Sequence, residues 1–311
     1  MAEEAATLSA VVCTHDTRRW DAFVRALDSL RTQTRRPDEI VVVVDGNPEL
    51  LERARDEHPD VVVVPNALQR GLSGARNTAV AVARGSLIVF LDDDAAAASD
   101  WVDRLERLCR RQGVLGAGGR VVPRWLGRRP SWFPEEFLWV VGCTYRGMPT
   151  AAAPVRNLYG GCFGIRRDVL VELGGFRTEL GRVGANGMGC EETELCIRAA
   201  RRYEGEIFLY DPDAVIDHDV PPNRTNWTYF RSRCFAEGVS KARLAQIVGK
   251  RDGLASERAY SLRTLPAGVV REASSGLRSG DQGGVLRSVA IVAGFTTTVL
   301  GYAYERIRKS R

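Results

Sequence analysis

The sequence lacks the residues and loops that several common classes of site require. It has only three histidines and seven cysteines in 311 residues, and no two cysteines form a C-x-x-C pair. This excludes a zinc-ribbon site, and an odd number of cysteines without a secretory signal predicts reduced thiols in the cytoplasm. There is neither a G-x-G-x-x-G motif nor a P-loop, and Thr14-His15-Asp16 follows the first expected strand without a glycine. These absences argue against a dinucleotide dehydrogenase and an ATPase.

Lysine is also scarce, so the positive charge is carried almost entirely by arginine. Lys241, Lys250 and Lys309 are the only lysines among 44 basic residues. The net charge of +5 is unevenly spread, because the segment from Arg224 onward has 16 basic and six acidic residues and residues 1–223 carry a net −5. A basic segment behind an acidic body can bind nucleic acid, an anionic membrane or a phosphorylated acceptor, and charge alone does not choose among them.

The first part of the chain alternates short apolar runs with helical patterns. The uniformly apolar run Leu87–Leu91 is typical of a parallel strand that is covered on both faces. Alternating strands and helices predict an α/β fold with a doubly wound, mostly parallel sheet, whose ligands bind beyond the carboxyl ends of the strands. Strands are expected at 8–13, 40–44, 61–64 and 87–91, and helices at 20–30, 48–57, 73–83 and 100–111, the last capped by Asp100.

This regularity ends after Val122, and a mixed region follows. Beyond Pro221-Pro222 the remainder has a helical pattern. Between these points we expect strands at 162–165, 207–210 and 214–216, helices at 167–173 and 191–203, and a glycine-rich loop at 174–189.

Asp92-Asp93-Asp94 directly follows the apolar strand at 87–91. Three carboxylates at the end of a strand repel one another unless a cation lies among them. The alternative is a solvated turn that caps the next helix. His218 is more often structural in such a place, but if it meets Asp94 in space, the pair suits Mn²⁺ or a similar ion.

A second acidic cluster opens the helix expected at 191–203. Acidic residues in a first turn favour the helix dipole, so Glu191 and Glu192 can be a charged cap. The phase of the helix favours a role beyond capping for Glu192, because this residue shares a face with Leu195 and Cys196. A carboxylate that points inward costs free energy of burial and is therefore expected to have a function. Action as a general base is one such function.

Two turns after strands could approach a nucleotide. Asp45-Gly46-Asn47 has ordinary turn chemistry but could also reach a nucleoside. Gly71–Asn77 is a glycine-rich helix start that can meet a phosphate, to which Arg76 would add charge. The tryptophans between 125 and 139 could stack on an acceptor sugar, lie at a membrane interface or simply pack on the core.

Taken in order, these segments resemble glycosyltransferase family 2, the inverting nucleotide-sugar transferases with the GT-A fold. The resemblance implies a GT-A domain over 1–240, with a nucleotide-sugar-binding half (8–122) and an acceptor and catalytic half (123–240), followed by a helical, basic extension (241–311). The matching segments are Ala10–Asp16, Ile40–Asn47, Gly71–Asn77, Leu87–Asp94, Asn157–Ile165, Gly189–Leu195 and Asp211–His218.

The resemblance also implies a role for individual residues. Asp94 and His218 match the metal ligands, and Glu192 matches the usual base, although the family commonly has Glu-Asp where this chain has Glu191-Glu192. Glu191, Trp132 and Trp139 are expected on the acceptor side. Donor contacts are expected from Thr14, His15, Asp45, Arg76, Asp92, Asp93, Gly160, Gly161 and Arg233.

The implied reaction moves a sugar from a nucleoside-diphosphate sugar, UDP by family frequency, to an acceptor hydroxyl with the help of Mn²⁺ or Mg²⁺. The acceptor would be a lipid-linked (polyprenyl) saccharide or a cell-envelope glycan, since some members transfer glucuronosyl groups to glycosyl-polyprenyl phosphates. No nucleic-acid partner is expected. The alternatives are an inactive sugar-nucleotide-binding or scaffold protein, which the intact carboxylates disfavour, and a sugar-1-phosphate nucleotidyltransferase, whose glycine-rich loop Thr14–Trp20 lacks.

The C-terminal segment favours contact with a membrane. Ser288–Tyr304 is a run of 17 residues without a charge, and Arg306, Arg308, Lys309 and Arg311 follow it. The run is shorter than the roughly 20 residues that span a bilayer, so a buried helix, an interfacial or re-entrant segment and a short span all stay open. Because a basic end suits anionic lipid, we expect the protein at the cytoplasmic face of the membrane.

Overall fold

A computed structural model describes residues 7–181, 188–249 and 255–308. The described chain divides into two compact units. Unit 1 comprises residues 7–121, 149–181 and 191–218, and unit 2 comprises 122–148, 188–190, 219–249 and 255–308. Part of the expected glycine-rich loop, residues 182–187, lies outside the described residues.

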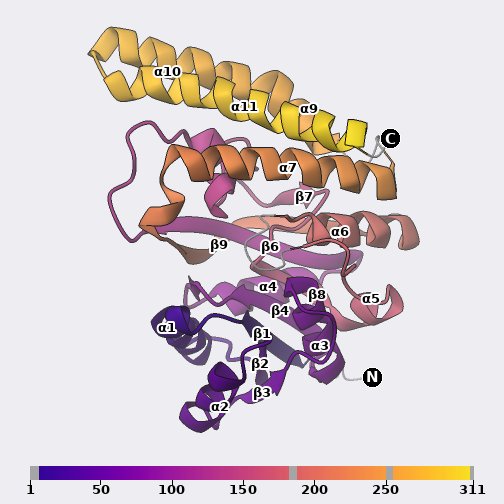
Figure 1. The fold of residues 1–311 in the computed structure, drawn as a ribbon. Helices are drawn as coiled ribbons and strands as arrows, with labels where there is room; N and C mark the ends of the chain where they lie inside the picture. Colours follow the sequence, from indigo (N-terminus) through magenta and orange to yellow (C-terminus); the bar gives the residue numbers. More distant parts are fainter. Residues whose placement is uncertain (1–6, 182–187, 250–254, 309–311) are drawn as a thin grey trace. The chain divides into compact units, whose positions relative to one another are not determined.

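Unit 1 is built on a mixed sheet with the strand order β3-β2-β1-β4-β8-β6-β9-β5, and β7 pairs with β9. The first four strands in this order are parallel to one another, and β8 is antiparallel to β4. This confirms the predicted α/β class with a doubly wound sheet (Figure 1). The strands are β1 (Leu8–Thr14), β2 (Glu39–Val44), β3 (Val62–Pro65), β4 (Leu87–Asp92), β5 (Ala95–Ala97), β6 (Val114–Trp125), β7 (Ala153–Val155), β8 (Cys162–Arg166) and β9 (Ile207–Val220).

Helices cover both faces of this sheet. On one face, residues of α3, α5 and α6 join inward-facing strand residues in a hydrophobic core. On the other face, Trp20 of α1 stacks on His58 at the end of α2, and Gln33 after α1 accepts a hydrogen bond from the Val102 amide of α4. Figure 1 shows α1 and α2 on the opposite side of the parallel strands from α3. The helices are α1 (Trp20–Arg31), α2 (Pro48–Glu57), α3 (Leu72–Val82), α4 (Trp101–Cys109), α5 (Arg167–Glu172) and α6 (Glu191–Arg202), and η1 (Thr17–Arg19) precedes α1.

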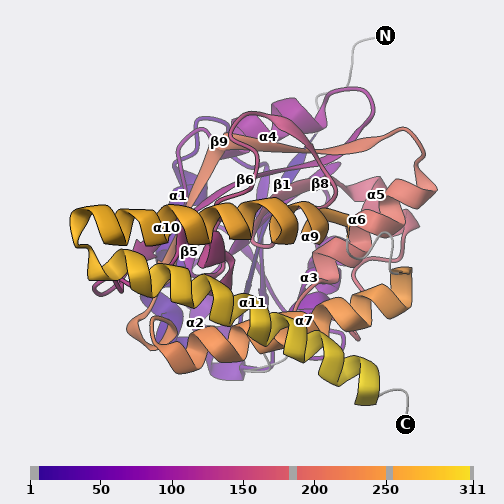
Figure 2. The same ribbon diagram turned by 90° about the horizontal axis from the view of Figure 1, so that it is seen from above.

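Unit 2 is mainly helical. A cluster of aromatic rings joins η2 to α7, and within it Trp132 stacks on Trp227 with ring centroids 4.3 Å apart. The helix α11 packs along both α7 and α10 (Figure 2). The helical elements are η2 (Glu135–Val141), η3 (Pro222–Arg224), α7 (Trp227–Val248), α9 (Ala255–Ala259), the π-helical turn η4 (Tyr260–Thr264), α10 (Leu265–Ser279) and α11 (Gln282–Arg308).

The structure differs from the prediction in four details. The two strands expected at 207–210 and 214–216 are one strand, β9, because Asp211-Pro212-Asp213 continues the extended backbone instead of turning. Asp100 precedes α4 but makes no capping hydrogen bond, since its carboxylate pairs with Arg104. The regular structure continues past Val122, because β6 extends to Trp125. The expected domain boundary at residue 240 falls inside α7.

Candidate functional site

The end of β4 and the end of β9 bring a set of metal-ligand side chains together in unit 1. The register pairs Ala95 with His218, which places the imidazole beside the aspartates that follow β4. His218 Nε2 lies 3.2 Å from Asp94 Oδ1. One potential ligand atom from each of Asp92, Asp94 and His218 lies within 4.8 Å of the other two. Two carboxylates and an imidazole are a donor set that fits Mn²⁺ or a similar divalent cation.

Asp93, the middle residue of the acidic run, has a different environment. Its carboxylate is buried, accepts a hydrogen bond from Thr14 Oγ1 (2.8 Å) and pairs with Arg19 (2.7 Å). Burial raises the pKa of Asp93, and the Arg19 guanidinium opposes that shift. Arg19 also lies 3.1 Å from Asp94 Oδ2, so it balances charge on two of the three aspartates.

Arg76 lies at the centre of the site as a buried cation. Its guanidinium is over the rings of Phe90, Phe163 and Phe176, at 5.5 to 5.7 Å from their centroids. On the other side, Nη1 lies 2.9 Å from Glu192 Oε1 and 3.3 Å from Glu191 Oε1. Its Nη2 lies 3.7 Å from Asp92 Oδ1. The three rings fix the guanidinium, and it links the acidic end of β4 to the acidic start of α6.

Two glycines allow these carboxylates to lie against the backbone before β8. A Cβ atom on Gly160 would lie 2.1 Å from Glu192 Oε1, and one on Gly161 would lie 2.2 Å from Asp92 Oδ2. Gly161 also has a φ of +79°, a conformation that favours glycine. Any side chain at either position would displace a carboxylate of the site.

The two carboxylate oxygens of Glu192 differ in their hydrogen bonding. Oε1 accepts the hydrogen bond from Arg76, and among the described residues no group donates to Oε2. Its side chain is 13% exposed, whereas that of Glu191 is 3% exposed. A carboxylate that is fixed through one oxygen and open through the other can accept a proton from a bound hydroxyl group.

The turns after β1 and β2 form the edge of the site. Asp45 accepts hydrogen bonds from Asn66 Nδ2 (2.7 Å) and from the Gly71 amide (2.9 Å), so both its oxygens hold the loop that leads into α3. His15 is exposed, and its carbonyl accepts a hydrogen bond from Asn47. The nucleoside contacts expected from these residues and from Thr14 stay predictions.

Three of the expected site residues, Trp132, Trp139 and Arg233, belong to unit 2. Arg233 is a buried residue of α7. Trp132 stacks on Trp227, and Trp139 Nε1 donates a hydrogen bond to the Tyr260 hydroxyl (3.1 Å). Part of each indole is therefore engaged in packing within unit 2, and their roles toward an acceptor stay predictions.

Sequence reasoning missed Arg19 and did not predict the carboxylate partners of Arg76. Thr17-Arg18-Arg19 contains two adjacent arginines, and only the fold shows that exposed Arg18 pairs with Asp16 while Arg19 reaches the aspartates. The guanidinium of Arg76 contacts carboxylates from both β4 and α6, and its expected place near the nucleotide stays a prediction.

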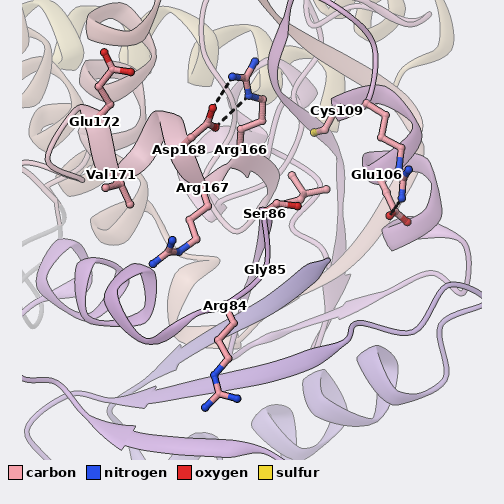
Figure 3. A pocket seen from close by; sticks show the side chains of 12 residues that line it. Arg84, Gly85, Ser86, Glu106, Cys109, Arg166, Arg167, Asp168, Val171 and Glu172 are labelled. Atoms are coloured by element: carbon pink, nitrogen blue, oxygen red, sulfur yellow. Dashed lines mark hydrogen bonds and ion pairs between the residues drawn. The ribbon is translucent and has the colours of Figure 1, made fainter. Parts of the chain in front are cut away.

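A wide hollow of about 980 Å³ lies at the opposite end of β4, at Leu87. Its carboxylates are engaged, because Asp168 pairs with Arg166 and Glu106 pairs with Arg110. Figure 3 shows the guanidinium groups of Arg84 and Arg166 pointing in different directions, so they do not converge on one ligand. The candidate site described above lies at the other end of the strand, where Asp92 ends β4.

Comparisons with known proteins concern the family and the fold of the chain. The family model described as glycosyl transferase family 2 matches residues 9–174. The chain is 37% identical over 238 residues to a glucosyl-dolichyl phosphate glucuronosyltransferase of Haloferax volcanii, covering 75% of this chain and 76% of that protein. It is 25% identical over 269 residues to the succinoglycan biosynthesis protein ExoM of Rhizobium meliloti, covering 85% and 80% of the two chains.

Among solved structures, the fold is similar to that of a mannosyltransferase from Pyrobaculum calidifontis in complex with GDP-Man and Mn²⁺. The TM-score is 0.59, the sequence identity is 17%, and the match covers 96% of this chain and 88% of that one. At this identity the likeness concerns the fold, which is the GT-A architecture.

Proposed function

The chain belongs to glycosyltransferase family 2, and we propose that it transfers a sugar from a nucleoside-diphosphate sugar to a hydroxyl group of a lipid-linked saccharide, with inversion at the anomeric carbon. The observation that carries the proposal is the position of Arg76, whose guanidinium contacts both Asp92 and Glu192. A donor-side carboxylate and a candidate base are thereby held on the two sides of one fixed cation.

In the proposed reaction Glu192 acts as the general base. Its free oxygen, Oε2, accepts the proton of the acceptor hydroxyl as that oxygen attacks the anomeric carbon. The bond between the anomeric carbon and the β-phosphate oxygen breaks, and the nucleoside diphosphate leaves with the electron pair. A single displacement of this kind inverts the configuration.

Asp92, Asp94 and His218 would hold a divalent cation, which when bound neutralises negative charge on the diphosphate. Arg19 keeps Asp93 and Asp94 in place, and Thr14 fixes Asp93 from the β1 side. Gly160 and Gly161 leave room for the two working carboxylates beside the backbone.

The lipid-linked acceptor rests on the similarity to the Haloferax volcanii protein, whose name gives a glucosyl-dolichyl phosphate as its acceptor. The basic segment after residue 223 is compatible with a phosphorylated lipid. UDP is the nucleotide that we propose, and the place of action is the cytoplasmic face of the membrane.

The function is tested with purified protein, Mn²⁺, a panel of UDP- and GDP-sugars and a synthetic glucosyl-polyprenyl phosphate. We expect acceptor-dependent release of UDP with UDP-glucuronate, and a product whose new linkage has the anomeric configuration opposite to that of the donor. Release of nucleotide with none of the donors, or a product that retains the configuration, would contradict the proposal.

The glycine before β8 provides a test of the site geometry. We expect Gly161→Ala to lower turnover by about 10²-fold, because the new Cβ would displace Asp92 and misplaced reacting groups cost about this much. Gly174→Ala is the matched control, since Gly174 has a similar φ of +72° but no atom within 4 Å of the added Cβ. Both variants place an alanine in the left-handed backbone conformation, which costs about 1–2 kcal/mol of stability.

Turnover and thermal unfolding of both variants are measured side by side. Gly174→Ala should keep the wild-type turnover at a lower unfolding temperature. Equal turnover of the two variants would show that the close approach of Gly161 to Asp92 has no part in the reaction.

A further inference from the structure

The distribution of buried and exposed side chains on helix α11 is the reverse of that usual for a helix of a water-soluble protein. Apart from Ile291, its buried residues are small or polar, whereas most of its large apolar side chains are exposed. The exposed positions recur every three or four residues along about six turns and carry no charge until Arg308. We call this surface the α11 apolar face, and it comprises Val285, Leu286, Val289, Val292, Phe295, Val299, Leu300, Tyr304 and Ile307, each at least 40% exposed.

The opposite face of α11 is locked to α7 and α10 within unit 2. A Cβ atom on Gly238 of α7 would lie 2.0 Å from the Thr298 carbonyl oxygen, and one on Gly301 would lie 2.1 Å from the Phe235 carbonyl oxygen. Near the start of α11, a Cβ atom on Gly284 would lie 2.7 Å from the Glu272 carbonyl oxygen of α10. Glycines at these crossings let the helix backbones touch, so α11 is an integral part of unit 2.

Ion pairs accompany this close packing. Arg243 of α7 pairs with Glu305 (2.9 Å), whose side chain is only 1% exposed. Arg287 of α11 pairs with Glu272 of α10 (2.5 Å). A helix that crossed a bilayer would take these charges into the hydrocarbon or would have to separate from its partners, and both are costly.

We propose that unit 2 rests on an anionic lipid bilayer through the α11 apolar face, with the axis of α11 in the plane of the membrane and no segment of it crossing. This rests on the lipid-linked acceptor proposed above, and it identifies the surface that meets the lipid. A charge-free face of exposed valine, leucine and phenylalanine suits the acyl region, and exposed Tyr304 suits the interface.

The charges of the neighbouring helix favour a bilayer over a second copy of the chain. Arg263 in η4 and Arg278 in α10 are exposed, and among the described residues neither pairs with a carboxylate. Arg308 ends α11 next to the apolar face. A second copy would bring like charges together, whereas anionic headgroups neutralise them.

Liposome flotation of the full chain with vesicles of phosphatidylglycerol and phosphatidylcholine tests the surface. We expect Val289→Glu/Val292→Glu to lower the floating fraction at least tenfold. The matched control is Leu68→Glu/Val171→Glu in unit 1, because these residues are 54% and 55% exposed and those of the test pair are 55% and 53% exposed. The control should float like the wild type, and equal flotation of both double variants would overturn the proposal.

The orientation is tested by labelling the two ends of α11. Gln282→Cys and Arg308→Cys are treated, on vesicles to which protein was added from outside, with a membrane-impermeant maleimide. Both single variants should react, because an in-plane helix keeps its two ends on the side of addition. Protection of one end while the other reacts would mean that α11 spans the bilayer, which overturns the proposal.

A second copy as the partner predicts a different result. In that case the wild type would be dimeric without lipid, and Val289→Glu/Val292→Glu would be monomeric in light scattering, which would also overturn the proposal. Nucleotide release with a water-soluble glucoside as acceptor is measured on every variant. A wild type that does not float but still releases nucleotide would refute only the contact surface, whereas a wild type that floats without releasing nucleotide would refute only the enzymatic proposal.

Discussion

Glu192→Gln is expected to lower kcat by about two to four orders of magnitude, the usual contribution of a general base. The amide keeps the shape of the side chain but cannot accept the proton of the acceptor hydroxyl. Its carbonyl oxygen can still receive the hydrogen bond that Arg76 Nη1 now donates to Oε1 (2.9 Å). Donor affinity should change little, because Glu192 is assigned to the acceptor side.

The measurement is single-turnover transfer at saturating donor, together with donor binding by calorimetry. Glu204→Gln, an exposed position just after α6, is the control for the chemical change itself. Glu191→Gln compares the two acidic neighbours, since both contact the same guanidinium. If donor binding collapses in Glu192→Gln while the bound complex turns over normally, Glu192 is a donor ligand and Glu191 becomes the candidate base.

The fold of unit 1 could be predicted closely because its signals are local. The run Leu87–Leu91 is apolar at every position, and the structure buries each of these residues in β4. The helix expected at 48–57 has the same bounds in the structure, since Pro48 starts it and Asn47 caps it. Asp211-Pro212-Asp213 misled the prediction, because residues that favour turns can also continue a strand such as β9.

The site could be predicted only in part, because ion pairs between distant segments leave no local pattern. Asp94 and His218 were predicted as a pair from the ends of two strands, and the fold brings them together with Asp92, which was predicted as a donor contact. The burial of Arg76 depends on Phe176, which lies 100 positions further along the chain, and on Glu192. No spacing in the sequence indicates such a contact. The exposure of the α11 apolar face could not be predicted either. The sequence shows an uncharged run but does not show which face of the helix packs against the rest of unit 2.

Asp94→Asn is expected to abolish metal-dependent turnover, with a loss of at least about three orders of magnitude in kcat/KM if the cation neutralises the leaving diphosphate. The substitution keeps the size of the side chain and removes one negative charge from the cluster. Asp94 lies between His218 (3.2 Å) and Arg19 (3.1 Å), so the amide also weakens both contacts. The protein should stay folded, because the hydrogen bond from Thr14 and the ion pair with Arg19 still hold Asp93.

Binding of Mn²⁺ is followed by electron paramagnetic resonance, and turnover is measured against Mn²⁺ concentration with and without chelator. Asp217→Asn is the matched control, because Asp217 precedes His218 in β9 and is exposed while His218 is buried. The control should bind Mn²⁺ and turn over like the wild type. Excess chelator should stop the turnover of the control and of the wild type. Full turnover of Asp94→Asn in excess chelator would remove the cation from the mechanism, and Arg19 would then be the nearest positive charge to Asp93 and Asp94.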